Sequence, residues 1–364
     1  MGSFVLVVGA RPNFVKAAPI LREIEDRASC QLVHTGQHYD FAMSGVFLEQ
    51  LGIRQPDVHL QIGSSTHGVQ TGKIMIAFDE YLAARREAPR AVIVVGDVNS
   101  TVACALVASK REIDVVHVEA GLRSFDRSMP EELNRIVTDA VSTRLLVSEP
   151  AGMENLAREG ISPDRVRYVG NVMIDTLVHQ LAAARETRVL DRWKLLHRGY
   201  AVVTIHRAGN VDVLSRLEHL VTLIERVSKL IPIVFPVHPR TNERLVGHEL
   251  MARLTAASGV HLCAPLGYRE FLGLVDGAKV VLTDSGGIQE ETSYLGVPCV
   301  TLRTTTERPV TLTGGTNVLV GDDIDRAYDV VRDAIQGQVV AARAIPGWDG
   351  RAASRIVDAL LELP

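Results

Sequence analysis

The sequence predicts an α/β protein made of two Rossmann-like, doubly wound domains that face a central cleft. Short runs of Val, Ile and Leu alternate with longer amphipathic segments, which is typical of parallel strands covered by helices on both faces. The same alternation of apolar runs and amphipathic segments starts again at Ala201, after a polar, helix-prone segment at residues 180–198. The chain has 364 residues, enough for two domains of roughly 100 to 200 residues each.

Five strands are expected in the first half of the chain and six in the second. Helical periodicity separates the strands, for example at residues 15–26 and 101–109. The expected strands are 4–8, 30–34, 91–95, 115–118, 145–147, then one starting at Ala201, 233–237, 260–262, 280–283, 299–302 and 318–320.

These elements divide the chain into three parts. Residues 1–170 form the first predicted domain and residues 171–345 form the second. A helix within 346–364 ends the chain, and packing back on the first domain is one option for it.

Composition excludes several classes of function. A net charge of −4 argues against a nucleic-acid-binding surface. The four cysteines are scattered without CxxC spacing, and the 12 histidines form no HExxH motif, so neither a disulfide framework nor a metal site is expected. No apolar run approaches the ~18 residues of a membrane span, and the chain starts directly with a strand pattern. We therefore expect a cytoplasmic protein with no membrane partner.

Polar motifs follow the predicted strands, at the edge where open α/β sheets bind ligands. In TDSGGIQEE, glycines at a strand-to-helix turn suit a phosphate, and the glutamates one turn further suit ribose hydroxyls. An ordinary acidic first turn without any ligand is the alternative. In VVGARPNFVK, Arg11 and Lys16 are placed to clamp a diphosphate, or are solvated surface cations. That turn lacks GxGxxG, so no NAD is expected.

Carboxylates and histidines also lie at strand ends. Asp97 and Glu119 each end a strand, and Glu131 and Glu132 begin a helix, where a cap or dipole role is the alternative explanation. Converging carboxylates would raise one another's pKa and permit acid/base chemistry. His206 and His238 follow strands of the second half and are either structural or phosphate-facing residues. Ser285 lacks the GxSxG elbow of a hydrolase nucleophile.

Taken together, the motifs resemble those of the non-hydrolysing UDP-N-acetylglucosamine 2-epimerases, which have a GT-B-like fold. The resemblance covers almost the whole chain. It rests, in order, on GARPNFVKAAPIL, HTGQHYD, GDVNST, HVEAGLRS, MPEELNR, VGNVMID, TIHR, PVHPR, TDSGGIQEE, GVPCVTLR and TTERP.

The resemblance implies a reaction and a set of site residues. UDP is eliminated to give 2-acetamidoglucal and is re-added with protonation of C2 from the opposite face, without a cofactor or metal. The implied catalytic residues are Asp97, Glu119, Glu131 and His206. The implied UDP contacts are Arg11, Lys16, His238, Ser285, Gly286, Gly287, Glu291 and Arg308. A homodimer is also implied, with a UDP-sugar as the substrate.

Many bacterial members of that family bind a second substrate molecule as an activator. The matching residues here are Gln37, His38, Gln70 and Arg207, but Val69 stands where an arginine is expected. Three other functions use the same motifs: a hydrolysing epimerase that releases N-acetylmannosamine and UDP, a UDP-sugar glycosyltransferase, and a nucleotide-sugar-binding regulator that has lost catalysis.

Overall fold

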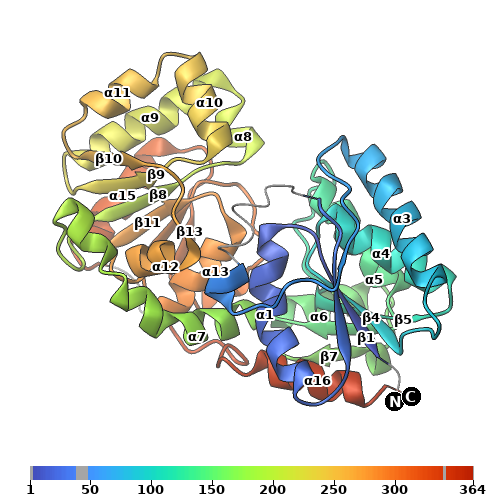
Figure 1. Ribbon diagram of the computed structural model, residues 1–364. Coiled ribbons are helices and arrows are strands. Elements are labelled where there is room, and N and C mark those ends of the chain that lie inside the picture. The colour runs from blue at the N-terminus through green and yellow to red at the C-terminus, as the bar shows by residue number, and fades with distance from the viewer. Residues whose placement is uncertain (1–2, 38–47, 339–341, 364) are drawn as a thin grey trace. The chain divides into compact units, whose positions relative to one another are not determined.

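A computed structural model describes residues 3–37, 48–338 and 342–363 of the chain (Figure 1). The chain forms two compact units. Unit 1 is Met1–His179 with Pro346–Pro364, and unit 2 is Gln180–Ile345. Each unit is a parallel sheet with helices packed on it, and in each the strand order reverses beside the first strand. The predicted α/β class with two doubly wound, Rossmann-like parts is confirmed.

The sheet of unit 1 has the order β3-β2-β1-β4-β5-β6-β7. Its strands are β1 (Phe4–Val8), β2 (Cys30–His34), β3 (Val58–His59), β4 (Ala91–Val95), β5 (Asp114–Ala120), β6 (Arg144–Val147) and β7 (Val166–Tyr168). β1, β2 and β4 have the predicted bounds. The edge strands β3 and β7 have two and three residues, too short to show an apolar run in the sequence.

Helices cover this sheet, and the end of the chain returns to it. They are α1 (Arg11–Glu25), α3 (His67–Ala83), α4 (Asn99–Lys110), α5 (Pro130–Val141), α6 (Pro150–Arg158), η1 (Pro163–Arg165), the start of α7 (Val172–Glu186) and α16 (Ala352–Leu361). α16 packs against α1 (Figure 1). Asp175 accepts hydrogen bonds from the Ala352 and Ala353 amides at 3.0 and 2.7 Å, which fixes the start of α16 on unit 1.

Unit 2 repeats the architecture in the order β10-β9-β8-β11-β12-β13. Its strands are β8 (Ala201–Thr204), β9 (Ile233–Pro236), β10 (Val260–Cys263), β11 (Val280–Thr283), β12 (Cys299–Thr301) and β13 (Asn317–Leu319). Its helices are η2 (Val189–Trp193), α8 (Ala208–Val211), α9 (Leu214–Ser228), α10 (Pro239–Gly247), α11 (Met251–Ala256), α12 (Tyr268–Asp276), α13 (Gly286–Leu295), α14 (Val310–Thr313) and α15 (Ile324–Ile335).

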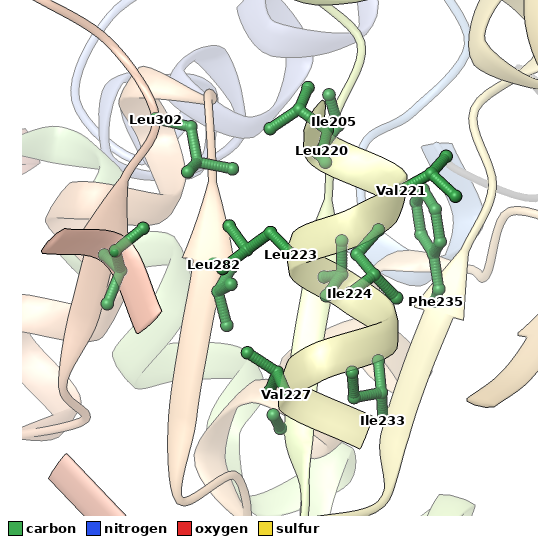
Figure 2. Packing of buried hydrophobic residues seen from close by; sticks show 14 of the residues in the cluster. Ile205, Leu220, Val221, Leu223, Ile224, Val227, Ile233, Phe235, Leu282 and Leu302 are labelled. Carbon is green, nitrogen blue, oxygen red and sulfur yellow. The ribbon is translucent and has the colours of Figure 1, made fainter. Parts of the chain in front are cut away.

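The core of unit 2 shows why its pattern folds this way. In α9, apolar residues recur every three or four positions, so they form one stripe on the helix. Figure 2 shows Ile224 and Val227 of this stripe gathered with Ile233, Phe235 and Leu282 from the strands below. All five side chains are almost completely buried. The packed sheet fixes where its strands end, and the loops that follow hold the polar motifs.

None of the helices in the described part of the chain is long and apolar enough to cross a membrane.

Candidate active site

The turn after β1 is tied to the end of β4 by one buried side chain. Asn13 Oδ1 accepts from the amides of Gly9 and Ala10, both at 3.1 Å, and its Nδ2 donates to the Val95 carbonyl at 2.8 Å. A Cβ on Gly9 would lie 2.0 Å from Ser100 Oγ, so only glycine fits there. The turn that carries Arg11 and Lys16 is therefore fixed against the turn that carries Asp97.

Lys16 forms a buried ion pair with Glu119. Both residues are 6% exposed. Gly96, with φ +69°, passes directly beside the pair: a Cβ there would lie 3.1 Å from Lys16 Nζ and 3.3 Å from a Glu119 carboxylate oxygen. The sequence predicted a diphosphate contact for Lys16, whereas the structure places its ammonium on one of the predicted catalytic acids. The contact with UDP remains a prediction.

Asp97 is held by α5. Arg135 Nη1 lies 2.5 Å from Asp97 Oδ2, while Arg135 Nη2 lies 2.6 Å from Glu132 Oε2. Asn134 adds a hydrogen bond to the Asp97 carbonyl at 2.8 Å. The Asp97 side chain stays 28% exposed, so it is fixed in orientation and still open to solvent.

Glu132 is structural. Its carboxylate accepts from the amides of Ser124 and Phe125 at 2.8 and 2.9 Å and pairs with Arg135. Burial alone would raise the pKa of Glu132, but the Ser124 amide and the Arg135 guanidinium lower it below its ordinary value. Glu132 thus anchors the loop before α5 and orients the arginine that contacts Asp97.

Glu131, by contrast, is half-buried, and no hydrogen bond or ion pair joins it to another described residue. It lies three and four positions before Asn134 and Arg135, so the three share the face of α5 that meets Asp97. Asp97 and Glu119 lie at the ends of the neighbouring strands β4 and β5, and α5, which carries Glu131, contacts Asp97 through Asn134 and Arg135. The expected crowding of like charges is relieved, because Asp97 and Glu119 each have a cationic partner.

In unit 2, Asp284 at the end of β11 organises the loop after β8. Its buried carboxylate accepts from the backbone amides of His206 and Arg207 at 3.1 and 2.9 Å, and from Asn210 Nδ2 at 3.0 Å. Burial would raise the pKa of Asp284, but its hydrogen bonds with the His206 side chain, Asn210 and Arg207 lower it.

Asp284 also orients His206. His206 Nδ1 lies 3.1 Å from Asp284 Oδ1, so in the neutral ring Nδ1 carries the proton and Nε2 is the basic nitrogen. The side chain is 38% exposed. The ring of His238 lies 5.4 Å away between centroids, and its Nδ1 accepts from the Arg240 amide and caps α10. The two predicted histidines are thus neighbours.

The start of α13 was predicted to be an anion cradle. Ser285 is its N-cap residue, with no side-chain cap bond, and Gly286 and Gly287 form the first turn. A Cβ on Gly286 would lie 2.7 Å from Arg308 Nη1, so the guanidinium lies against the helix terminus. The free amides, the helix dipole and a cation at one place suit a phosphate group.

Carboxylates hold that arginine in place. Arg308 Nε lies 2.7 Å from Glu290 Oε1, and Arg308 Nη1 lies 3.7 Å from Glu307 Oε2. Glu307 is also bonded by both terminal nitrogens of Arg303, at 2.9 and 2.7 Å. Burial would raise the pKa of Glu307, but the two guanidinium groups hold it far below its usual range.

Glu291 has unmet hydrogen-bonding capacity. Its side chain is buried, and Tyr268 donates to Oε1 at 3.1 Å. Oε2 is equally buried and has no hydrogen-bond partner among the described residues. Burial, with a further contribution from the charge of Glu290, raises the pKa of Glu291 to about 7, against the opposing Tyr268 hydrogen bond. Glu291 lies one turn after Gly287, as ribose recognition beside a phosphate cradle requires.

The predicted effector residues are part of the internal hydrogen-bond network. Gln37 Oε1 accepts from the amide and hydroxyl of Ser100 at 3.1 and 2.8 Å. Gln70 donates to the carbonyls of Gln37 and Gly63 at 3.1 and 2.9 Å and accepts from Asn99 Nδ2 at 2.8 Å. Both glutamines therefore fix the loop after β2 onto α4.

The remaining effector residues belong to other elements of the chain. Arg207 belongs to unit 2, where its Nε donates to the Asp284 carbonyl at 3.1 Å. Val69 is half exposed on α3. His38 and the side chain of Arg11 lie outside the described residues. An activating role for this set remains a prediction.

Sequence reasoning missed several residues that build the site. Asp284 had a visible signal, because it directly follows an apolar strand, as Asp97 does. Arg135 lies one turn after Glu131 and was detectable by helical spacing. Asn13 and Tyr268 had no such signal, since their roles depend on contacts between segments distant in the chain, and the contact of Glu290 with Arg308 was not visible either.

Known proteins share this architecture. A family model described as UDP-N-acetylglucosamine 2-epimerase matches residues 22–361. The UDP-N-acetylglucosamine 2-epimerase of Methanocaldococcus jannaschii is 42% identical over 332 residues, covering 90% of each chain. The UDP-2,3-diacetamido-2,3-dideoxy-D-glucuronate 2-epimerase of Pseudomonas aeruginosa is 38% identical over 362 residues, covering 98% of this chain and 99% of that one.

Solved structures are similar over the same length. The crystal structure of the M. jannaschii UDP-GlcNAc 2-epimerase in complex with UDP-GlcNAc and UDP has a TM-score of 0.90 and 39% identity, covering 99% of both chains. The UDP-GlcNAc 2-epimerase from Neisseria meningitidis bound to UDP-GlcNAc has a TM-score of 0.89 and 28% identity, covering 99% of this chain and 100% of that one. Both matches span unit 1 and unit 2.

Proposed function

Because the chain belongs to the UDP-N-acetylglucosamine 2-epimerase family, we propose that it reversibly converts UDP-N-acetylglucosamine to UDP-N-acetylmannosamine. The family, the enzyme class and the GT-B-like fold inferred from the motifs are confirmed by these matches. The observation that carries the choice of substrate class is the buried, unpartnered oxygen of Glu291 beside the α13 cradle. A nucleotide supplies both the phosphates for the cradle and the hydroxyl donors for the carboxylate.

Unit 2 holds the nucleotide in this proposal. The first-turn amides of α13 and the Arg308 guanidinium bind the diphosphate, and Glu291 accepts from the ribose hydroxyls. Arg308 also stabilises the negative charge that develops on UDP as the bond to C1 breaks. Glu290 keeps the guanidinium at the helix terminus before the ligand binds, which reduces the reorganisation needed during the reaction.

Unit 1 supplies the proton transfers. One carboxylate takes the proton from C2 while the C1–O bond breaks and its electron pair leaves with UDP, which gives 2-acetamidoglucal. Return of UDP to C1, with protonation of C2 from the opposite face, forms the epimer. Two faces require two proton-transfer groups, and we assign them to two of Asp97, Glu119 and Glu131, which is supported by the position of Asp97 and Glu119 at neighbouring strand ends. His206, oriented by Asp284, is the further proton-handling group.

A second substrate is supported by a specific observation. The P. aeruginosa relative that is 38% identical along almost the entire chain is named for a UDP-2,3-diacetamido-2,3-dideoxy-D-glucuronate. That sugar has the same UDP leaving group and the same 2-acetamido carbon, so the chemistry at C1 and C2 would be identical. Only groups that contact C3 and C6 would distinguish the two substrates.

Proton NMR in D₂O, without NAD or added metal, tests the proposal. The purified protein is incubated with UDP-N-acetylglucosamine and, separately, with the diacetamido uronate. We expect UDP-N-acetylmannosamine with deuterium at C2. Stoichiometric free UDP and N-acetylmannosamine would instead identify a hydrolysing enzyme, and turnover of the uronate alone would identify the second substrate.

The negative result is equally informative. If neither sugar reacts, even with a trace of UDP-N-acetylmannosamine as activator, the epimerase proposal fails and acceptors for a glycosyltransferase become the next test. We also propose a cytoplasmic homodimer, as the resemblance implies, which light scattering and cell fractionation test directly.

A further inference from the structure

Glu119 lies at an irregular position in β5. The pairing of β5 with β6 shifts register between Val118 and Ala120. Glu119, at this bulge, has φ +74°, a left-handed conformation that a residue with a side chain rarely adopts. Such a conformation persists only when the surrounding contacts fix it. The contacts that fix Glu119 therefore determine where its carboxylate points.

One buried carboxylate from α5 spans this bulge. Asp139 Oδ1 lies 2.6 Å from His117 Nδ1, and Asp139 Oδ2 accepts from the Gly121 amide at 3.1 Å. His117 lies two residues before Glu119 and Gly121 lies two residues after it. Asp139 is 1% exposed. The two oxygens of Asp139 thus hold both ends of the short segment that has Glu119 at its centre.

The same network continues to β4. His117 Nε2 donates to the Gly96 carbonyl at 2.9 Å, and the Gly96 amide donates to the Val118 carbonyl at 3.1 Å. Gly96 follows the last residue of β4 and has φ +69°. Its carbonyl therefore accepts a hydrogen bond from the His117 imidazole and not from a neighbouring strand. Gly96 directly precedes Asp97. His117 therefore links the backbone that supports Glu119 to the backbone that supports Asp97.

An arginine keeps Asp139 charged. Arg123 Nη2 lies 2.7 Å from Asp139 Oδ2 and 2.6 Å from Glu159 Oε2. Burial would raise the pKa of Asp139, but His117 and Arg123 lower it below its ordinary value. An ionised carboxylate can accept from His117 and Gly121 at the same time, whereas a protonated one would present a hydroxyl to one of them.

We propose that Asp139, acting through His117 and Gly121, is a positioning residue that aligns Glu119 and Asp97 for proton transfer at C2 of the sugar. The inference rests on the proposed epimerase function. Asp139 is buried and does not contact substrate. A purely structural role predicts a loss of stability alone. A positioning role predicts in addition that the ratio of released 2-acetamidoglucal to epimer changes.

The variant Asp139→Asn tests this. An asparagine has one acceptor oxygen and one NH₂ group, so it cannot accept from both His117 and Gly121. We expect kcat to fall by up to about 100-fold, because a small displacement of a reacting group is costly. KM should change less than about threefold. The fraction of 2-acetamidoglucal released per turnover should rise severalfold, since the proton donor for C2 is misaligned while UDP can still leave.

The matched control is Asp175→Asn. Asp175 is another buried carboxylate of unit 1 that accepts from two backbone amides, at the start of α16. We expect it to lower thermal stability without changing the ratio of released glycal to epimer. A second variant, His117→Gln, should raise that ratio as Asp139→Asn does. It tests the positioning role of the Asp139–His117 contact if Asp139→Asn fails to fold.

Two results would overturn the inference in different ways. If the folded Asp139→Asn or His117→Gln protein keeps the wild-type ratio of glycal to epimer, Asp139 is structural only. If the wild-type protein itself forms no epimer in the same assay, the proposed function fails and the inference with it.

Discussion

Replacing Glu291 by glutamine should stabilise the free protein and weaken UDP binding. The carboxylate is buried, with one oxygen on Tyr268 and the other without a partner among the described residues. Its pKa is raised from an ordinary 4.5 to about 7, first by burial and then by the charge of Glu290. Glu291→Gln keeps the shape and the Tyr268 contact but removes the charge.

The size and sign follow from proton linkage. A pKa that rises from 4.5 to about 7 on folding corresponds to about 3 kcal/mol, at about 1.4 kcal/mol per pH unit. Below pH 4.5 both states hold the proton, so the native state is not penalised. As pH rises, the unfolded state ionises first and binds fewer protons than the native state. The free energy of unfolding therefore falls between pH 4.5 and 7 and stays low above that range.

Urea unfolding at pH 5, 6, 7 and 8 measures this difference. The two tryptophans of the chain, Trp193 and Trp348, lie in unit 2 and unit 1 respectively. A Trp348→Phe background leaves Trp193 as the fluorescent reporter of unit 2. The free energy of unfolding falls by about 2 kcal/mol per molar urea. We therefore expect the difference in urea midpoint between Glu291→Gln and its parent to grow by about 1.5 M from pH 5 to pH 8.

The comparison between variant and parent isolates Glu291, because every other ionisable group is the same in both proteins. A midpoint difference that is the same at every pH would refute the argument that the buried carboxylate is destabilising. Calorimetry with UDP supplies the second half of the test. A charge-assisted hydrogen bond contributes about 1.5–3 kcal/mol, so UDP affinity should fall about 10- to 100-fold in the variant. Unchanged affinity would remove Glu291 from the nucleotide site.

Two further substitutions test the neighbouring contacts. Gly286→Ala puts a Cβ 2.7 Å from Arg308 Nη1, so the UDP dissociation constant measured by calorimetry should rise about 10-fold; an unchanged constant would show that the guanidinium moves freely. Arg135→Lys keeps the charge but cannot contact Asp97 and Glu132 together, so kcat should fall about 10- to 100-fold; wild-type turnover in the folded variant would show that one contact is enough.

The fold was predictable because its signal is local. β1, β2, β4 and β11 have the bounds that their apolar runs predict, since a parallel strand buried on both faces must be apolar throughout. β5 extends to Ala120 and includes Glu119 in a bulge, which breaks the apolar run that the prediction relied on. The edge strands β3 and β7 were missed because two or three residues form no pattern.

The sequence indicated which strand ends carry polar residues, but not how those residues pair. Strand ends marked Asp97, Glu119, His206 and Ser285, because topology alone collects such residues at one edge of a sheet. The partner of each charge was not visible. Lys16 was assigned to a diphosphate because it lies near Arg11 in the turn after the first strand, while its ammonium in α1 is paired with Glu119 of β5.

Adjacent glutamates illustrate the limit of sequence reasoning most clearly. The motifs PEE and QEE each contain two carboxylates, and composition gives no reason to prefer one of them. In each pair one glutamate anchors an arginine: Glu132 holds Arg135, and Glu290 holds Arg308. The arginine in turn shapes the candidate site.

Helix geometry explains why the other member of each pair is the better candidate for contact with substrate. Successive residues of an α-helix point about 100° apart, so the two carboxylates of each pair have different surroundings. Among the described residues, Glu132 and Glu290 each contact an arginine, whereas Glu131 has no hydrogen bond or ion pair and Glu291 Oε2 has no hydrogen-bond partner. A buried or half-buried carboxylate with unmet capacity is unfavourable in the free protein, and a ligand that supplies donors removes that cost. The contact with an arginine, a property only of the folded chain, therefore distinguishes Glu132 and Glu290 from the two glutamates that we propose for contact with substrate.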